Sequence, residues 1–428
     1  MRVAFQEGYS KQVMTVDITF VEQIITVIMM RLLIFVVACL SVIPSLAQKK
    51  EISQAKASIK SKSNLEKAEN DLRKLLKDST HREDVKIHTA LTNVVRTQYE
   101  INNEKMYLKQ AIDTASFFTT TRKMFLAYEA LDSAEAGLLG NGNITTAKSR
   151  KKNATLLEKY RQNLYNGGLY FVRNAKYKDA FNSFDTYIDC MRQPLFSAHV
   201  ASFDTTTMST AAFWTLFCGY KINNPQMALK YADLALKNEK YRSRSFQYLV
   251  EVYEQQKDLS HYLDALKQGF MENKTSRFFF TKLVDYYNDK NLLDSALQVV
   301  DYSLQEEPDN SLFLFAKSNI LLNKGDYDGC ISITDKLIAR LDTVPELYYN
   351  AGISYLNKAL LPETSNVVMD AKEIDQCLKM SMLYMEKYRA MRPEDRERWV
   401  TPLYNIYFKL NMGKQFEEMS NLLQKMRK

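Results

Sequence analysis

Apolar and small residues recur along this chain at steps of 34 residues. Three rows keep this register: Phe280, Leu314 and Tyr348; Val284, Ser318 and Gly352; and Tyr287, Leu321 and Tyr355. A fourth row links Ala296 to Cys330. A constant period of this length is typical of architectures in which one structural unit is repeated and each copy packs on the next.

The composition favours helices as the repeated elements. The chain has 428 residues, of which 46% are hydrophobic, so it can bury a large core. It contains only 12 glycines and 8 prolines, whereas a large β protein needs many tight turns built from these residues. Tyrosine (26) and phenylalanine (22) are abundant, which predicts packing by aromatic rings.

Within the repeats, three stretches resemble the tetratricopeptide repeat (TPR). They are "YYNAGISY", "ALQVVDYSLQEEPDN" and "YFVRNAKYKDAFNSF". The matching core positions are Gly168, Phe171, Ala180, Phe184, Tyr287, Ala296, Pro308, Gly352 and Tyr355. The resemblance implies an all-α fold, an α-solenoid of antiparallel helix pairs (a TPR superhelix), with small residues where two helices approach and aromatic residues between pairs.

The pattern divides the chain into segments. Residues 1–47 are an upstream extension plus a signal peptide, and residues 48–137 hold degenerate helical repeats. Residues 138–154 are expected to form a loop, and residues 155–393 a TPR array with inserted material at about 357–377. Residues 394–428 are a C-terminal repeat or cap. The insertion is expected to lengthen both helices of its pair.

The stretch from Met30 has the composition of an export signal. One positive charge, Arg31, precedes an apolar run that ends in Ser45-Leu46-Ala47, which predicts cleavage before Gln48. Translation is expected to start at Met29 or Met30. Two alternatives stay open: lipidation at Cys39, and an uncleaved membrane anchor. We therefore expect an exported protein of the periplasm, or of the periplasmic face of the outer membrane, that meets the membrane only through this segment.

Neither the charge nor the cysteines indicate a specialised site. The net charge is +8, and part of the excess lies in "KSRKKNATLLEKYR" without any nucleic-acid-binding motif, so no nucleic-acid partner is expected. Cys190, Cys218, Cys330 and Cys377 are widely spaced and fit buried free thiols, although a Cys190–Cys218 disulfide stays open.

The sequence lacks the residue patterns of catalysis. The histidines are scattered, and a metal site at His81 and His88 is a weak alternative. "GNGNIT" lacks the lysine of a phosphate-binding loop. We therefore expect no enzymatic activity, no metal and no cofactor.

If the resemblance holds, side chains of the first helix of each pair face a binding groove. The candidates are Tyr165, Arg173, Gln247, Glu251, Glu254, Asp285, Asn319, Asn323, Tyr349 and Asn357. Glu251, Glu254 and Asp285 predict an acidic middle. A further row, Gln255, Asp289, Asn323 and Asn357, either closes the first helices or bonds an extended peptide. Phe315 stands where family members that clamp a carboxylate have lysine.

Asp followed by Ser or Thr and then Ala, Val or Thr occurs six times and resembles an O-glycosylation motif of Gram-negative envelope proteins. The hydroxyl residues are Ser79, Thr114, Ser133, Thr205, Ser295 and Thr343. Helix capping is the alternative, above all for Asp204 and Asp342.

These observations predict a non-catalytic TPR scaffold that binds a protein or peptide in the cell envelope. Two other functions stay open, a glycan- or nutrient-uptake component of the outer membrane and a membrane-anchored regulator.

Overall fold

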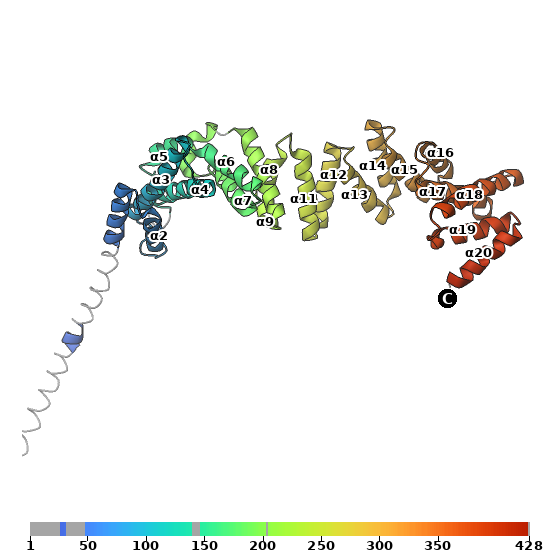
Figure 1. Ribbon diagram of the computed structural model, residues 1–428, viewed down its shortest axis with the longest axis horizontal. Coiled ribbons are helices and arrows are strands. Elements are labelled where there is room, and N and C mark those ends of the chain that lie inside the picture. The colour runs from blue at the N-terminus through green and yellow to red at the C-terminus, as the bar shows by residue number, and fades with distance from the viewer. Residues whose placement is uncertain (1–25, 31–47, 139–145, 203, 427–428) are drawn as a thin grey trace, which may run out of the picture. The chain divides into compact units, whose positions relative to one another are not determined.

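The computed structural model describes residues 26–30, 48–138, 146–202 and 204–426. Every regular element within them is a helix, so the described chain is all-α, as predicted. The chain forms two compact units, Met1–Asn238 (unit 1) and Glu239–Lys428 (unit 2). Figure 1 shows the helices of each unit following one another side by side.

Unit 1 begins with helical residues 48–61. Its further helices are α2 (Leu65–Leu75), α3 (Val85–Tyr107), α4 (Thr114–Glu135), α5 (Arg150–Glu158), α6 (Arg161–Arg173), α7 (Tyr177–Asp189), the 3-10 helix η1 (Pro194–Ser202), α8 (Thr205–Lys221), α9 (Pro225–Leu229) and α10 (Ala232–Leu236). The pairs α3–α4, α6–α7 and α8–α9 pack together.

Unit 2 consists of ten helices in the described residues. They are α11 (Arg242–Gln256), α12 (Leu259–Glu272), α13 (Arg277–Asp289), α14 (Leu293–Glu306), α15 (Ser311–Lys324), α16 (Tyr327–Ile338), α17 (Pro345–Thr364), α18 (Ala371–Met391), α19 (Arg396–Lys409) and α20 (Gly413–Met426). Each odd-numbered helix packs against the helix that follows it.

A left-handed residue closes the first helix of most pairs. The residues and their φ angles are Ala175 (56°), Asn223 (53°), Lys257 (58°), Asn291 (54°), Gly325 (82°) and Asn411 (53°). The amide after each of them donates to the carbonyl five residues before it, at 2.8–3.0 Å. Asn223, Lys257, Asn291 and Gly325 lie 34 residues apart. The period is therefore a period of backbone conformation, carried by different residue types.

Small residues allow the close approach of paired helices. A Cβ added to Gly168 of α6 would lie 2.5 Å from the Phe184 ring of α7, and one added to Gly352 of α17 would lie 2.7 Å from the Met385 sulfur of α18. Ser318, in the same row as Gly352, is fully buried. Each of these positions lacks the room for a larger side chain.

The other predicted core residues lie where the repeat pattern places them. Phe171, Ala180, Phe184 and Ala296 are buried. Pro308 lies in the connection between α14 and α15. Tyr287 and Tyr355 are only half-buried, as amphipathic rings often are at the edge of a core.

The inserted material lengthens one helix pair. α17 has 20 residues and α18 has 21, against 14 and 12 in α15 and α16. Ser381 of α18 donates to the Gly352 carbonyl of α17 at 2.7 Å, so the pair keeps its close contact despite the insertion. A capping box of Asp370 and Glu373 starts α18 anew after the connection.

The expected loop at 138–154 is too long. α5 begins at Arg150, because Ala154 and Leu157 form an apolar stripe that is buried against the rest of unit 1. Residues 139–145 of that loop lie outside the described part of the chain.

Most of the predicted leader, residues 31–47 with the cleavage site, also lies outside the described residues. The helices that the structure does describe include none with the length and apolarity needed to cross a membrane.

Candidate peptide-binding face

The structure distributes the predicted groove residues over both units. Tyr165 and Arg173 belong to α6 of unit 1, and the other eight belong to α11, α13, α15 and α17 of unit 2. The exposed Arg173 ends its helix, while the half-buried Tyr165 packs edge-on against Phe184 at a centroid distance of 5.6 Å. We define the first-helix face as the surface of unit 2 carried by these four helices.

Three polar residues form the central row of the first-helix face. Glu251 of α11, Asp285 of α13 and Asn319 of α15 follow one another at 34-residue steps. Asp285 is exposed, and Glu251 and Asn319 are half-buried. The next residue of the row, Ile353, is apolar, so the polar part of the face covers three repeats.

The acidic character of this face is weaker than the sequence predicted. Both carboxylate oxygens of Glu254 accept hydrogen bonds from Lys282 Nζ at 2.9 Å. Lys282 comes from α13 and also lies 5.6 Å from the Phe278 ring centroid. The ion pair therefore neutralises Glu254 and leaves Glu251 and Asp285 as the acidic groups of the row.

A buried amide supports the third member of the row. Asn350 of α17 is only 3% exposed, and its Nδ2 donates to Asn319 Oδ1 and to Ser318 Oγ. The bond fixes the Asn319 amide and leaves its own NH₂ group to donate to a ligand. The signal that reveals Asn350 in the sequence is a polar residue within an otherwise apolar core stretch.

Tyr349 is less accessible than predicted. The Arg398 guanidinium lies 3.9 Å from its ring centroid, and the Tyr388 ring lies at 5.2 Å. A cation over one ring face occupies the surface that a sugar or proline would use. Tyr349 thus joins α17 to α18 and α19 within unit 2.

The row of Gln255, Asp289, Asn323 and Asn357 supports the helix-closing interpretation for three members. The first three are at or next to the last residue of α11, α13 and α15. Asn357 was wrongly expected to close its helix, because the insertion extends α17 to Thr364.

Ion pairs between neighbouring repeats went unnoticed in the sequence. Asp294 of α14 pairs with Lys324 of α15, and Asp328 of α16 pairs with Lys358 of α17. Both partners keep the 34-residue register. A search for paired positions of opposite charge at the repeat period would have found them.

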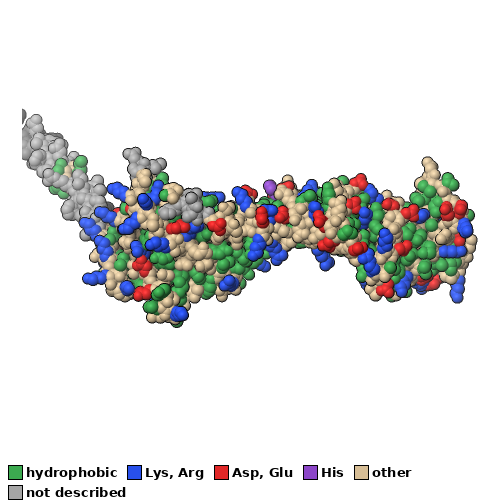
Figure 2. Space-filling model, turned by 90° about the horizontal axis from the view of Figure 1, so that it is seen from above, with side chains coloured by type: hydrophobic (Ala, Val, Ile, Leu, Met, Phe, Trp, Pro, Cys, Tyr) green, Lys and Arg blue, Asp and Glu red, His purple; other side chains and the backbone are tan. Residues whose placement is uncertain are grey.

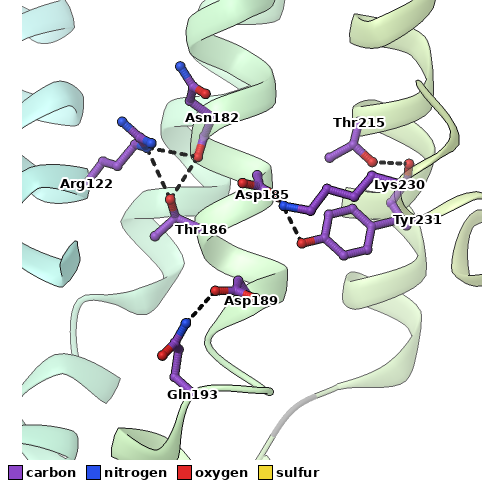
Figure 3. Close-up of polar contacts among 10 residues, drawn as sticks. Arg122, Asn182, Asp185, Thr186, Asp189, Gln193, Thr215, Lys230 and Tyr231 are labelled. Atoms are coloured by element: carbon purple, nitrogen blue, oxygen red, sulfur yellow. Dashed lines mark hydrogen bonds and ion pairs between the residues drawn. The ribbon is translucent and has the colours of Figure 1, made fainter. Parts of the chain in front are cut away.

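Unit 1 contains a polar cluster that joins α4 to α7 and to the bend between α9 and α10 (Figure 3). Arg122 Nε donates to the Asn182 carbonyl and to Thr186 Oγ1, each at 3.1 Å. Asp185 accepts hydrogen bonds from Tyr231 Oη at 2.8 Å and from Lys230 Nζ. Burial raises the pKa of Tyr231 and lowers the pKa of Arg122. The contacts tie three helices together.

Glu129 of α4 belongs to the same region. Burial, with a further contribution from Asp189, raises its pKa to about 8. Its Oε1 is buried and accepts no hydrogen bond within the described part of the chain. The side chain is therefore largely protonated at neutral pH.

Structural roles account for most of the proposed glycosylation motifs. Asp113 and Asp204 cap α4 and α8, so the prediction for Asp204 is confirmed. Asp132 pairs with Arg150 at 2.8 Å, and Asp294 is paired as described. The prediction for Asp342 was wrong, because Val344 is the N-cap of α17. Ser79 and Thr343 are exposed in turns, whereas Thr114, Ser133, Thr205 and Ser295 are helical.

The cysteines and histidines form no assembled site in the described residues. Cys190 and Cys218 are buried free thiols, so the disulfide left open by the sequence is not formed. His88 Nε2 lies 2.9 Å from the Arg82 carbonyl oxygen, and no group of three potential metal ligands occurs among the described side chains.

The helix pairs, their left-handed turns and their 34-residue register define an α-solenoid of the tetratricopeptide-repeat type. No protein-family model and no curated protein matches the sequence.

Similar solved structures include three helical-repeat proteins. PilW, a type IV pilus biogenesis factor, has a TM-score of 0.32 and 13% identity over 51% of this chain and 92% of PilW. The TPR domain of P58(IPK) has a TM-score of 0.24 and 12% identity over 89% of this chain and 99% of that domain. Yeast Tom70 has a TM-score of 0.26 and 11% identity over 89% of this chain and 91% of that chain. The assignment of the fold rests on the chain's own repeat geometry.

Proposed function

We propose that this protein is a non-catalytic scaffold that binds an extended protein segment on the first-helix face of unit 2. The observation that carries the proposal is the central row of Glu251, Asp285 and Asn319 on three successive first helices. Stacked helix pairs present such rows on a continuous surface, which is how solenoids recognise extended ligands.

The chemistry of the row indicates the kind of segment. Two carboxylates favour a segment with lysine or arginine, because unlike charges attract across an interface. The Asn319 amide donates to a backbone carbonyl of the bound segment. We therefore expect a basic or mixed-polarity peptide that crosses α11, α13 and α15.

Export to the periplasm, or to the periplasmic face of the outer membrane, belongs to this proposal and is supported by the leader in the sequence. The glycan-binding alternative requires an open aromatic platform, and in this face Arg398 covers Tyr349.

Site-specific photo-crosslinking in intact cells tests the proposal. A photoreactive residue at Asp285 should capture a discrete protein partner, and the same residue at the exposed Gln298 of α14 should not. The variant E251K should reduce the capture of that same partner at Asp285. Equal capture at both positions, or capture that E251K leaves unchanged, would contradict a role for this face.

A further inference from the structure

A second polar groove lies in unit 1, between α3, α4 and α5. Its cavity has a volume of about 530 Å³. α3 contributes Thr89, Asn93 and Arg96, and α5 with its C-cap contributes Lys152, Thr155 and Lys159. The groove is thus walled by cations, hydroxyls and an amide.

The fold of α5 explains why the lysines line this groove. The helix buries Asn153, Ala154 and Leu157 on one stripe. Lys152 and Lys159 are seven residues apart and therefore lie on one face of the helix, separated by about 10 Å. Both side chains are exposed.

The positive charge of the groove is left uncompensated. Arg150 and Arg161 next to it are paired with Asp132 and Glu158. Lys152 and Lys159 have no acidic partner among the residues described in the structure. Figure 2 shows many Lys and Arg side chains on the visible face of the N-terminal unit. An anionic ligand therefore gains two ion pairs without breaking an existing one.

The other lining groups match a peptide backbone. The hydroxyls of Thr89 and Thr155 donate to carbonyls of their own helices, at 2.7 and 2.9 Å, so their oxygens remain available to accept from a peptide N–H. Asn93 is exposed and has both a donor and an acceptor. The span between the lysines corresponds to about three residues of an extended strand.

One acidic residue in the groove distinguishes a peptide from a polyanion. Glu135 also lines the cavity, where its Oε2 accepts from the Ser149 amide and hydroxyl at 2.8 and 2.7 Å. A nucleic acid carries negative charge at every step and would meet this carboxylate. A peptide can place a neutral residue there and its acidic residues at the lysines.

The geometry points to a docking groove in unit 1 for an acidic protein segment, with Lys152 and Lys159 binding two carboxylates about three residues apart. This groove is separate from the first-helix face of unit 2 and has the opposite charge preference.

Fluorescence anisotropy with the full chain tests the inference. The probe is a nine-residue peptide with aspartate at every third position and neutral residues elsewhere; the comparison peptide has asparagine in place of each aspartate. We expect the acidic peptide to bind at least about tenfold more tightly than the neutral one, with an affinity that falls as salt is raised.

Charge-reversal variants locate the binding. K152E and K159E should each weaken binding by about three- to tenfold, because each loses an ion pair and gains a repulsion. K151E is the matched control: Lys151 is exposed on the same helix but does not line the groove, so its effect should stay below about twofold. D285K in unit 2 should leave this binding unchanged, which separates a failure here from a failure of the proposed function.

Several outcomes would overturn the inference. They are equal affinity for the acidic and neutral peptides, an equal loss in K151E, and no binding at about 1 mM peptide. Tighter binding of a single-stranded oligonucleotide that is weakened by K152E and K159E would identify a nucleic-acid site instead. Circular dichroism of each variant establishes that it has folded.

Discussion

Glu129 offers a direct test of the polar packing in unit 1. The pKa of its carboxyl is raised from 4.5 to about 8, first by burial and then by Asp189, while Arg122 opposes the shift. The folded state therefore holds a proton that the unfolded chain releases at lower pH. Its contribution to the free energy of unfolding is highest below pH 4.5 and falls as the pH rises to about 8.

The size of this effect follows from the shift. Each pH unit between the two pKa values costs about 1.4 kcal/mol, which gives about 4 kcal/mol for full burial. Partial exposure of the side chain reduces this to about 2 kcal/mol. The variant E129Q keeps the shape and removes the charge. It should stabilise the protein by about 2 kcal/mol at pH 8 and change it by less than about 0.5 kcal/mol at pH 5.

Urea unfolding of the full chain at both pH values measures the difference between variant and wild type, so that all other titrations cancel. E83Q, at an exposed turn residue, is the control and should show no such pH dependence. An equal effect of E129Q at pH 5 and pH 8, or destabilisation at both, would show that Glu129 is ionised and partnered, and the reasoning would fail.

Three further predictions concern packing, thiols and modification. A Cβ on Gly219 of α8 would lie 2.2 Å from a backbone nitrogen of α9, so G219A should lower the free energy of unfolding by about 3 kcal/mol, whereas G413A, with no atom within 4 Å, should change it by less than about 0.5 kcal/mol; equal effects in urea unfolding would contradict the close helix contact. Burial raises the pKa of the Cys218 thiol to about 12, so alkylation at pH 8 should be slow in the native protein and fast after unfolding, and rapid native labelling by mass spectrometry would refute this burial. If the native protein is O-glycosylated, peptide mapping should place the glycan on the exposed turn residues Ser79 or Thr343 and not on the helical motifs, and an intact mass equal to that of the bare polypeptide would exclude the modification.

The candidate site was only partly predictable. The 34-residue step placed Glu251, Asp285 and Asn319 on equivalent first helices, because the position of a residue on a helix follows from its sequence register. The step could not show that Lys282 neutralises Glu254 or that Asn350 holds Asn319. Those contacts join different repeats.

The sequence by itself determined the helix pairs, their order and the small residues at their contacts, because helical periodicity and close packing are written in local spacing. Tertiary structure decided which charges remain free: Arg398 covers Tyr349, and the lysines of α5 stay unpaired in the described chain while the neighbouring arginines do not. The physical reason is that charge at a surface depends on which side chains approach one another in space, and residues brought together by stacking lie about one repeat or more apart in the sequence.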